Sequence, residues 1–181
     1  MKDRLKRTND ELKADRPTID EIKFINKTPI YIMLENIRSV HNVGSIFRTA
    51  DGFGVSKILL TGYTACPPRD DLSKTALGAD KVVSWEHFDN PLDAIEVLKK
   101  NSIHPIAIEQ TINSKCIFDY EFNFPSCFIL GNEVNGISED LLNCVSDHIE
   151  ISMKGIKQSF NVSVAAGIVC SEMTRQNLLL S

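Results

Sequence analysis

The sequence predicts an α/β protein, with a mostly parallel β-sheet flanked by helices. Short apolar runs alternate with amphipathic segments from Thr28 onward, and polar motifs follow the ends of several apolar runs. Strand–helix alternation of this kind is typical of sheets with helical crossovers. The expected strands are residues 30–34, 57–61, 81–85, 103–108, 127–130 and 148–151, and the expected helices are residues 42–53, 90–100, 138–144 and 160–177.

Length and composition are those of an ordinary globular protein. With 181 residues, 43% of them hydrophobic and 24% charged, the chain fits one domain with a substantial core. No apolar run approaches the roughly 20 residues that span a bilayer. The charged start MKDRLKRTND is unlike a secretory signal. We therefore expect a cytoplasmic protein with no membrane partner.

The cysteines and histidines give no sign of a disulfide or a metal. The five cysteines are odd in number, no pair is spaced Cys-x-x-Cys, and several lie in apolar runs. Buried reduced thiols are therefore the expected state. The four histidines lack metal-ligand spacing, so we expect no bound metal.

The first 29 residues differ in character from the rest. We expect a charged N-terminal extension over residues 1–29 and one folded domain over residues 30–181. Residues 1–16 hold six basic and four acidic side chains, and Pro17 prevents a helix from continuing. This segment is either a solvated helix or a basic arm that holds a polyanion or packs on a partner subunit. The net charge of −4 leaves an RNA partner open, because affinity depends on local phosphate contacts.

The segment NIRSVHNVGSIFRTADGFGV, residues 36–55, follows the first expected strand. Apolar residues repeat with helical spacing from Val43, so one side of a helix should be buried. Asn42 stands where an N-cap belongs, and Gly44 would leave room for a ligand. Arg48 lies off the apolar stripe, close to a helix N-terminus that attracts anions. It is either a phosphate contact or a solvated side chain.

The segment CFILGNEVNGIS, residues 127–138, is an apolar run that ends in Gly131 and Glu133. An Asn-Gly pair then predicts a turn. Ligands of parallel α/β sheets gather beyond the C-terminal ends of the strands, where Glu133 would lie. The alternative is a plain strand-to-helix loop in which Ser138 caps the next helix. That alternative does not explain a carboxylate between glycines.

The segment HIEISMKGIKQSFNVSVAAGIVCSE, residues 148–172, combines a strand, a basic loop and an apolar helix rich in small residues. The strand should end at Ile151 and the helix should begin near Phe160. Ser159 or Asn161 fits the N-cap of this helix. The helix belongs either to the core or to a subunit interface.

Together and in this order, the three segments resemble the signature motifs of the SpoU/TrmH family of RNA methyltransferases, within the SPOUT class. The resemblance covers about residues 30–172, which is most of the chain. The first motif is carried by Asn36, Arg38, Asn42, Gly44, Arg48 and Ala50, the second by Gly131, Glu133 and Gly136, and the third by Ser159, Asn161, Ser163 and Ala165.

The resemblance implies an enzyme that transfers a methyl group from S-adenosylmethionine to a ribose 2′-hydroxyl of tRNA or rRNA. It also implies a C-terminal trefoil knot and a homodimer in which each active site is built across the interface. The cofactor would lie in the knot, held largely by the main chain at Ile108, Gly131, Ile151, Ser159 and Phe160.

The resemblance also implies roles for the polar residues. Arginine is too strongly protonated to be an ordinary base. We therefore expect Arg48 to bind the substrate phosphate and stabilise the developing alkoxide. The implied catalytic set is Arg48, Asn42, Glu133, Ser159 and Asn161. The implied RNA contacts are Arg38, Arg48, Lys154 and Lys157, and further candidate phosphate contacts are Arg69, Lys74 and Lys81.

One departure and two alternatives accompany this interpretation. Ser152 stands where many members of the family have proline, in a segment that would hold the cofactor by its backbone.

A conventional dinucleotide-binding enzyme is disfavoured because Gly52-Phe53-Gly54 lacks the third glycine and ends a helix. The second alternative is a catalytically silent, RNA-binding relative. Against it stand the intact Asn42, Arg48, Glu133 and Asn161.

Overall fold

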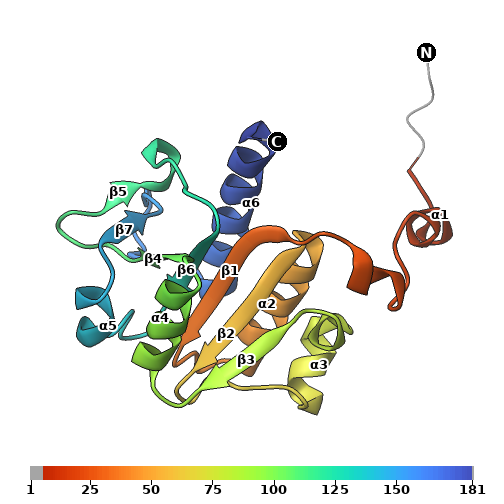
Figure 1. Cartoon of the computed structure of the whole chain (residues 1–181), viewed down its shortest axis with the longest axis horizontal. Coiled ribbons are helices and arrows are strands. Elements are labelled where there is room, and N and C mark those ends of the chain that lie inside the picture. The colour runs from red at the N-terminus through yellow and green to blue at the C-terminus, as the bar shows by residue number, and fades with distance from the viewer. Residues whose placement is uncertain (1–5, 181) are drawn as a thin grey trace.

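The computed structural model describes residues 6–180, and its core is one seven-stranded sheet, drawn in Figure 1. The strand order is β3-β2-β1-β6-β4-β7-β5, and every neighbouring pair is parallel. The predicted fold class, a mostly parallel sheet with flanking helices, is confirmed. The strands are β1 (Thr28–Glu35), β2 (Val55–Thr61), β3 (Trp85–Phe88), β4 (His104–Ile108), β5 (Lys115–Cys116), β6 (Ser126–Leu130) and β7 (Asp147–Glu150).

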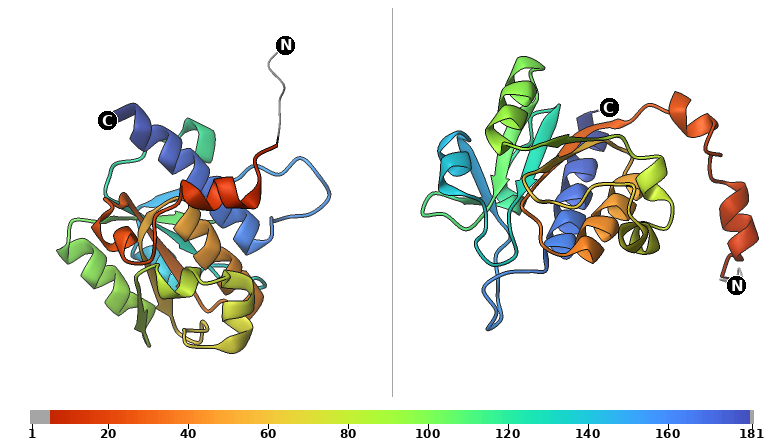
Figure 2. Two further views of the ribbon diagram at one scale, coloured as in Figure 1. Left: turned by 90° about the vertical axis from the view of Figure 1, so that its right-hand side faces the viewer. Right: turned by 90° about the horizontal axis from the view of Figure 1, so that it is seen from below.

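Helices cover both faces of the sheet (Figure 2). On one face, α2 (Val40–Gly52), α3 (Asp70–Ala76) and α6 (Val162–Leu180) contribute buried side chains to the larger core cluster. On the other face, α4 (Pro91–Lys100) and α5 (Glu139–Asn143) build a second cluster. Because both faces are covered, the central strands are continuous apolar runs, and all five residues of β6 are buried.

The third expected strand is wrong in position. Residues 81–85 were expected to form a strand, but Ala79–Lys81 is a 3-10 turn, and β3 begins only at Trp85. The turn is held by the buried Asp80, whose carboxylate accepts a 2.7 Å hydrogen bond from the Ser73 hydroxyl. The sequence also did not predict α3, which is mostly polar and buries only two side chains, or the two-residue strand β5.

The start of α2 differs from the prediction in two ways. Ser39, not Asn42, is the N-cap, and its hydroxyl accepts the Asn42 backbone N–H at 3.3 Å. Gly44 makes room for a helix instead of a ligand. A Cβ on Gly44 would lie 2.0 Å from Thr75 Oγ1 and 2.6 Å from the Leu72 carbonyl oxygen of α3. The glycine therefore sets the close approach of α3 to α2.

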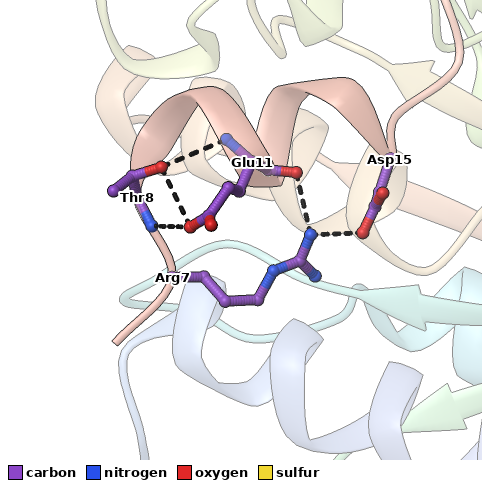
Figure 3. Close-up of polar contacts among 4 residues, drawn as sticks. All are labelled: Arg7, Thr8, Glu11 and Asp15. Atoms are coloured by element: carbon purple, nitrogen blue, oxygen red, sulfur yellow. Dashed lines mark hydrogen bonds and ion pairs between the residues drawn. The ribbon is translucent and has the colours of Figure 1, made fainter. Parts of the chain in front are cut away.

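The N-terminal segment contains a short exposed helix, α1 (Asn9–Ala14), away from the sheet. Thr8 and Glu11 form a capping box, and Arg7 binds the Glu11 carbonyl and the Asp15 carboxylate (Figure 3). None of its residues is buried, as expected of a solvated helix. Lys2 and Arg4 of the expected basic arm lie outside the described residues. The division at residue 29 stays a prediction.

All five cysteines are free, but only Cys127 and Cys170 are buried. Burial raises the pKa of both thiols, which keeps them protonated. The expectation of buried thiols is wrong for Cys144, which is exposed. Within residues 6–180 no group of side chains is arranged to hold a metal ion, and no helix is long and apolar enough to cross a membrane.

Candidate functional site

A cavity of about 810 Å³ opens beyond the C-terminal ends of β4, β6 and β7. These three strands are neighbours in the sheet, so the residues that follow them converge at one edge. The loop from β7 to α6 forms another wall. All five residues expected to hold a cofactor line this cavity, namely Ile108, Gly131, Ile151, Ser159 and Phe160.

The loop after β6 is closed on itself at Gly131. Asn132 and Gly136 exchange two backbone hydrogen bonds, at 3.0 and 2.9 Å. A Cβ on Gly131 would lie 2.2 Å from the Gly136 carbonyl carbon and 2.3 Å from the Ile137 nitrogen. Gly136 itself has a φ of +68°, in the left-handed region. These two glycines are thus required by the loop geometry that forms one wall of the cavity.

Glu133 projects from this loop to the start of α2. Its carboxylate accepts hydrogen bonds from the backbone N–H of Arg38 at 2.9 Å and of Ser39 at 3.1 Å. It also accepts one from the Asn42 side-chain amide at 2.9 Å. Partial burial opposes ionisation, but these hydrogen bonds outweigh it and lower the pKa of Glu133. The Glu133 carboxylate is therefore ionised, and its hydrogen bonds connect the second motif to the first.

Asn42 connects the same network to the third motif. Its side-chain oxygen accepts a 3.2 Å hydrogen bond from the amide of Asn161. The Asn161 oxygen accepts from the Ser163 backbone N–H at 2.9 Å and from its hydroxyl at 2.7 Å, so Asn161 caps α6. Glu133, Asn42 and Asn161 come from segments far apart in the sequence, and the fold joins them at the rim of the cavity.

Arg48 lies apart from this network in the single chain. It is exposed, and it lines a second cavity of about 590 Å³ between α2 and α3. The two cavities share no lining residue. Arg48 lies six residues after Asn42, or about 9 Å along the axis of α2. The other expected RNA contacts, Arg38, Lys154 and Lys157, are exposed side chains outside both cavities.

Comparison with known proteins decides the family. Residues 29–171 match the model of the SpoU rRNA Methylase family. The chain belongs to this family. The 23S rRNA (guanosine-2′-O-)-methyltransferase RlmB of Vibrio parahaemolyticus is 30% identical over 88% of this chain, which spans only 64% of that relative's length. The tRNA (guanosine(18)-2′-O)-methyltransferase of Aquifex aeolicus is 30% identical over 81% of this chain and 69% of its own.

Solved structures of RNA-modifying enzymes have the same fold. The crystal structure of the A. aeolicus TrmH/SpoU tRNA modifying enzyme superposes with a TM-score of 0.80 at 25% identity, covering 90% of this chain and 83% of that one. The AdoMet-bound rRNA methyltransferase of Sinorhizobium meliloti gives a TM-score of 0.77 at 25% identity, over 85% and 59%.

Sequence reasoning missed several residues that support the site of this SpoU-family chain. Asn132 is buried, and its amide donates to the Asn36 carbonyl at 2.8 Å and to the Tyr63 hydroxyl at 2.7 Å. Glu35 is also buried and accepts from the Ser138 backbone N–H at 2.9 Å and its hydroxyl at 2.5 Å. The Ser138 side chain therefore does not cap α5, contrary to the alternative considered above. Polar residues at the ends of apolar strands were the available signal.

Glu133→Gln should destabilise the protein at neutral pH by about 1 kcal/mol. Hydrogen bonds to charged groups contribute about 1.5–3 kcal/mol, and exposure of the Glu133 side chain to solvent reduces this. Because the folded-state pKa of Glu133 is lowered, its contribution to stability is complete above the ordinary glutamate pKa of 4.5. It is lost as the pH falls through the folded pKa. Urea denaturation of both proteins at pH 7 and under acid conditions measures the difference.

Glu121→Gln is the matched control, because Glu121 is exposed, lies outside the helices and the cavity, and its side chain has no hydrogen bond or ion pair within residues 6–180. It should leave the unfolding free energy nearly unchanged at both pH values. If Glu133→Gln were as stable as wild type at neutral pH, the hydrogen bonds of the Glu133 carboxylate between the two motifs would not stabilise the fold, and the prediction would be wrong.

Proposed function

We propose that this chain transfers a methyl group from S-adenosylmethionine to a ribose 2′-hydroxyl of tRNA or rRNA. The observation that carries the proposal is the convergence of Asn42, Glu133 and Asn161 at the rim of the strand-end cavity, in a chain of the SpoU family. The relatives described above are named as 2′-O-methyltransferases of 23S rRNA and tRNA.

The strand-end cavity fits the cofactor in size and chemistry. Its volume of about 810 Å³ lies in the range of small-molecule sites, roughly 300–1,000 Å³. Apolar side chains, including Ile108, Ile151 and Phe160, offer a surface for the adenine ring. Glu109 and Glu150 also line the cavity and would attract a cation. Bound S-adenosylmethionine, a sulfonium cation, would supply the electrophilic methyl group.

The polar residues of the chain would prepare the ribose hydroxyl. A hydroxyl is a poor nucleophile at neutral pH, so its developing negative charge has to be stabilised. We assign that task to Arg48, which would also bind the neighbouring phosphate. Asn42, Glu133, Ser159 and Asn161 would position the hydroxyl for in-line attack. Arg38, Lys154 and Lys157 would contact RNA outside the reacting group.

A homodimer would reconcile the two separate cavities. Arg48 of the partner subunit would reach the strand-end cavity of the first chain. Exposed apolar side chains at and on α6 offer a surface for association, including Phe160, Val164 and Leu178. The dimer, the trefoil knot and the cytoplasmic location stay predictions. The catalytically silent alternative has no support.

Cofactor titration and methyl transfer test the proposal together. Isothermal titration should give heat with S-adenosylmethionine and with its demethylated product. Labelled methyl from the cofactor should enter RNA from cells that lack the gene, and mass spectrometry of nucleosides should find it on a ribose 2′-oxygen. Cofactor binding without transfer to any RNA would favour the silent relative, and methyl on a base would exclude ribose methylation.

A further inference from the structure

The cavity between α2 and α3 holds two positive charges without a negative one. Its lining residues are Ser45, Arg48, Thr49, Lys74, Thr75 and Leu77. Neither the Arg48 guanidinium nor the Lys74 ammonium has a hydrogen bond or an ion pair within residues 6–180. Two cations that face one cavity repel each other unless an anion lies between them. The lining of this cavity is therefore suited to an anionic ligand.

The fold places Lys74 there through Gly44. Because a Cβ at Gly44 would overlap Thr75 and the Leu72 carbonyl, only glycine lets α3 lie this close to α2. Thr75 is turned inward and donates its hydroxyl to the Leu72 carbonyl at 3.0 Å. Its neighbour Lys74 is exposed and lines the cavity from α3, opposite Arg48 of α2.

The structure also separates Lys74 from the other candidate phosphate contacts nearby. Arg69 forms two hydrogen bonds with the Asp71 carboxylate, at 2.8 and 2.9 Å, so its charge is already compensated. Lys81 lies in the 3-10 turn after α3 and does not line the cavity. Lys74 alone of the three lines the cavity with Arg48.

We infer that the α2–α3 cavity binds a phosphodiester group of the RNA substrate, with Lys74 as a second phosphate-binding residue beside Arg48. The Arg48 fork offers several N–H donors, the Lys74 ammonium adds three, and the Ser45 and Thr49 hydroxyls add neutral donors. Phosphate contacts of this kind hold the register of a nucleic acid without reading its sequence. Lys74 would thus position the RNA backbone while Arg48 acts at the reacting nucleotide. The inference rests on the proposed function, since it needs an RNA substrate.

The test compares Lys74→Ala with Lys74→Arg and with Lys100→Ala. Lys100 is the matched control because it is an exposed lysine without a hydrogen bond or ion pair among the described residues, on α4 across the sheet. The measurements are filter binding of RNA from cells that lack the gene, at several KCl concentrations, and the KM and kcat of methyl transfer. Cofactor titration and light scattering on every variant check that the cofactor affinity and the oligomeric state are unchanged.

Lys74→Ala should weaken RNA binding by about ten-fold and raise the RNA KM to match, with kcat and cofactor affinity unchanged. The slope of log affinity against log salt should fall by about 0.7–0.9, the value for one lost phosphate contact. Lys74→Arg should restore most of the affinity, and Lys100→Ala should resemble wild type.

Equal RNA affinity and salt slope for Lys74→Ala and Lys100→Ala would overturn the inference and leave the proposed function intact. A dimer that dissociates in Lys74→Ala would overturn it too, because Lys74 would then contact an acidic group of a second copy and not a phosphate. If wild type binds RNA through Lys74 but transfers no methyl group, the proposed function fails and the phosphate site stands.

Discussion

Arg48→Ala should lower the rate of methyl transfer by about a hundred- to a thousand-fold while leaving cofactor affinity unchanged. The size of the effect is that of removing one group that stabilises developing charge in a transition state. Cofactor binding should survive because, within one chain, Arg48 is not among the residues that line the strand-end cavity. Single-turnover transfer of labelled methyl to RNA measures the rate, and isothermal titration measures the cofactor affinity.

Arg48→Lys separates the effect of the Arg48 charge on methyl transfer from the effect of its planar guanidinium. Lysine keeps the positive charge but loses the planar fork that binds two phosphate oxygens at once, so only part of the activity should return. Near-normal transfer by Arg48→Ala would show that another group stabilises the alkoxide, and the assignment of Arg48 would be wrong.

Gly131→Ala should remove most of the cofactor affinity, by at least about ten-fold. The added Cβ would overlap backbone atoms of Gly136 and Ile137, and backbone cannot rotate away as a flexible side chain can. The loop must therefore open, at a cost of about 1–3 kcal/mol, and the cavity wall moves with it. Isothermal titration with S-adenosylmethionine and thermal denaturation measure the two effects.

Gly155→Ala is the control for this prediction, since a Cβ on Gly155 would meet nothing within 4 Å. It should bind the cofactor as wild type does. An unchanged cofactor affinity in Gly131→Ala would mean that the strand-end cavity is not the cofactor site. If each site is shared between two subunits, mixed dimers of Gly131→Ala and Arg48→Ala should regain activity, because one of their two sites is intact.

The predictions from sequence succeeded where a signal is local and repeated. The apolar stripe of α2 from Val43 to Ala50 is buried as its spacing predicts, and the apolar runs of β1, β2, β4, β6 and β7 are strands within a few residues. They failed where one tertiary contact outweighs the local pattern. The apolar residues after Lys81 suggested a strand, but the buried Asp80–Ser73 hydrogen bond holds a turn there.

The candidate site also combines features that the sequence predicted with contacts that only the folded structure showed. Its residue types, and their positions after apolar strands, were readable from the sequence, and their joint order carried the resemblance to the family. The sequence could not show that Glu133 ties to the backbone at Arg38 and Ser39, or that Asn42 bonds to Asn161 across 119 positions. Such contacts depend on which strands are neighbours, and strand order is a property of the folded chain.

The sequence by itself therefore determined the fold class, the family and the polar residues at the strand ends. Spacing and local sterics decide these, and both are properties of short segments. Only the tertiary structure decided where the residues meet. It joined Asn42 by hydrogen bonds to Glu133 and Asn161, which line one cavity, put Arg48 at another, and assigned Gly44 to helix packing. The physical reason is that the parallel sheet brings distant strand ends to one edge, while the Gly44 contact sets α3, with Lys74, against α2.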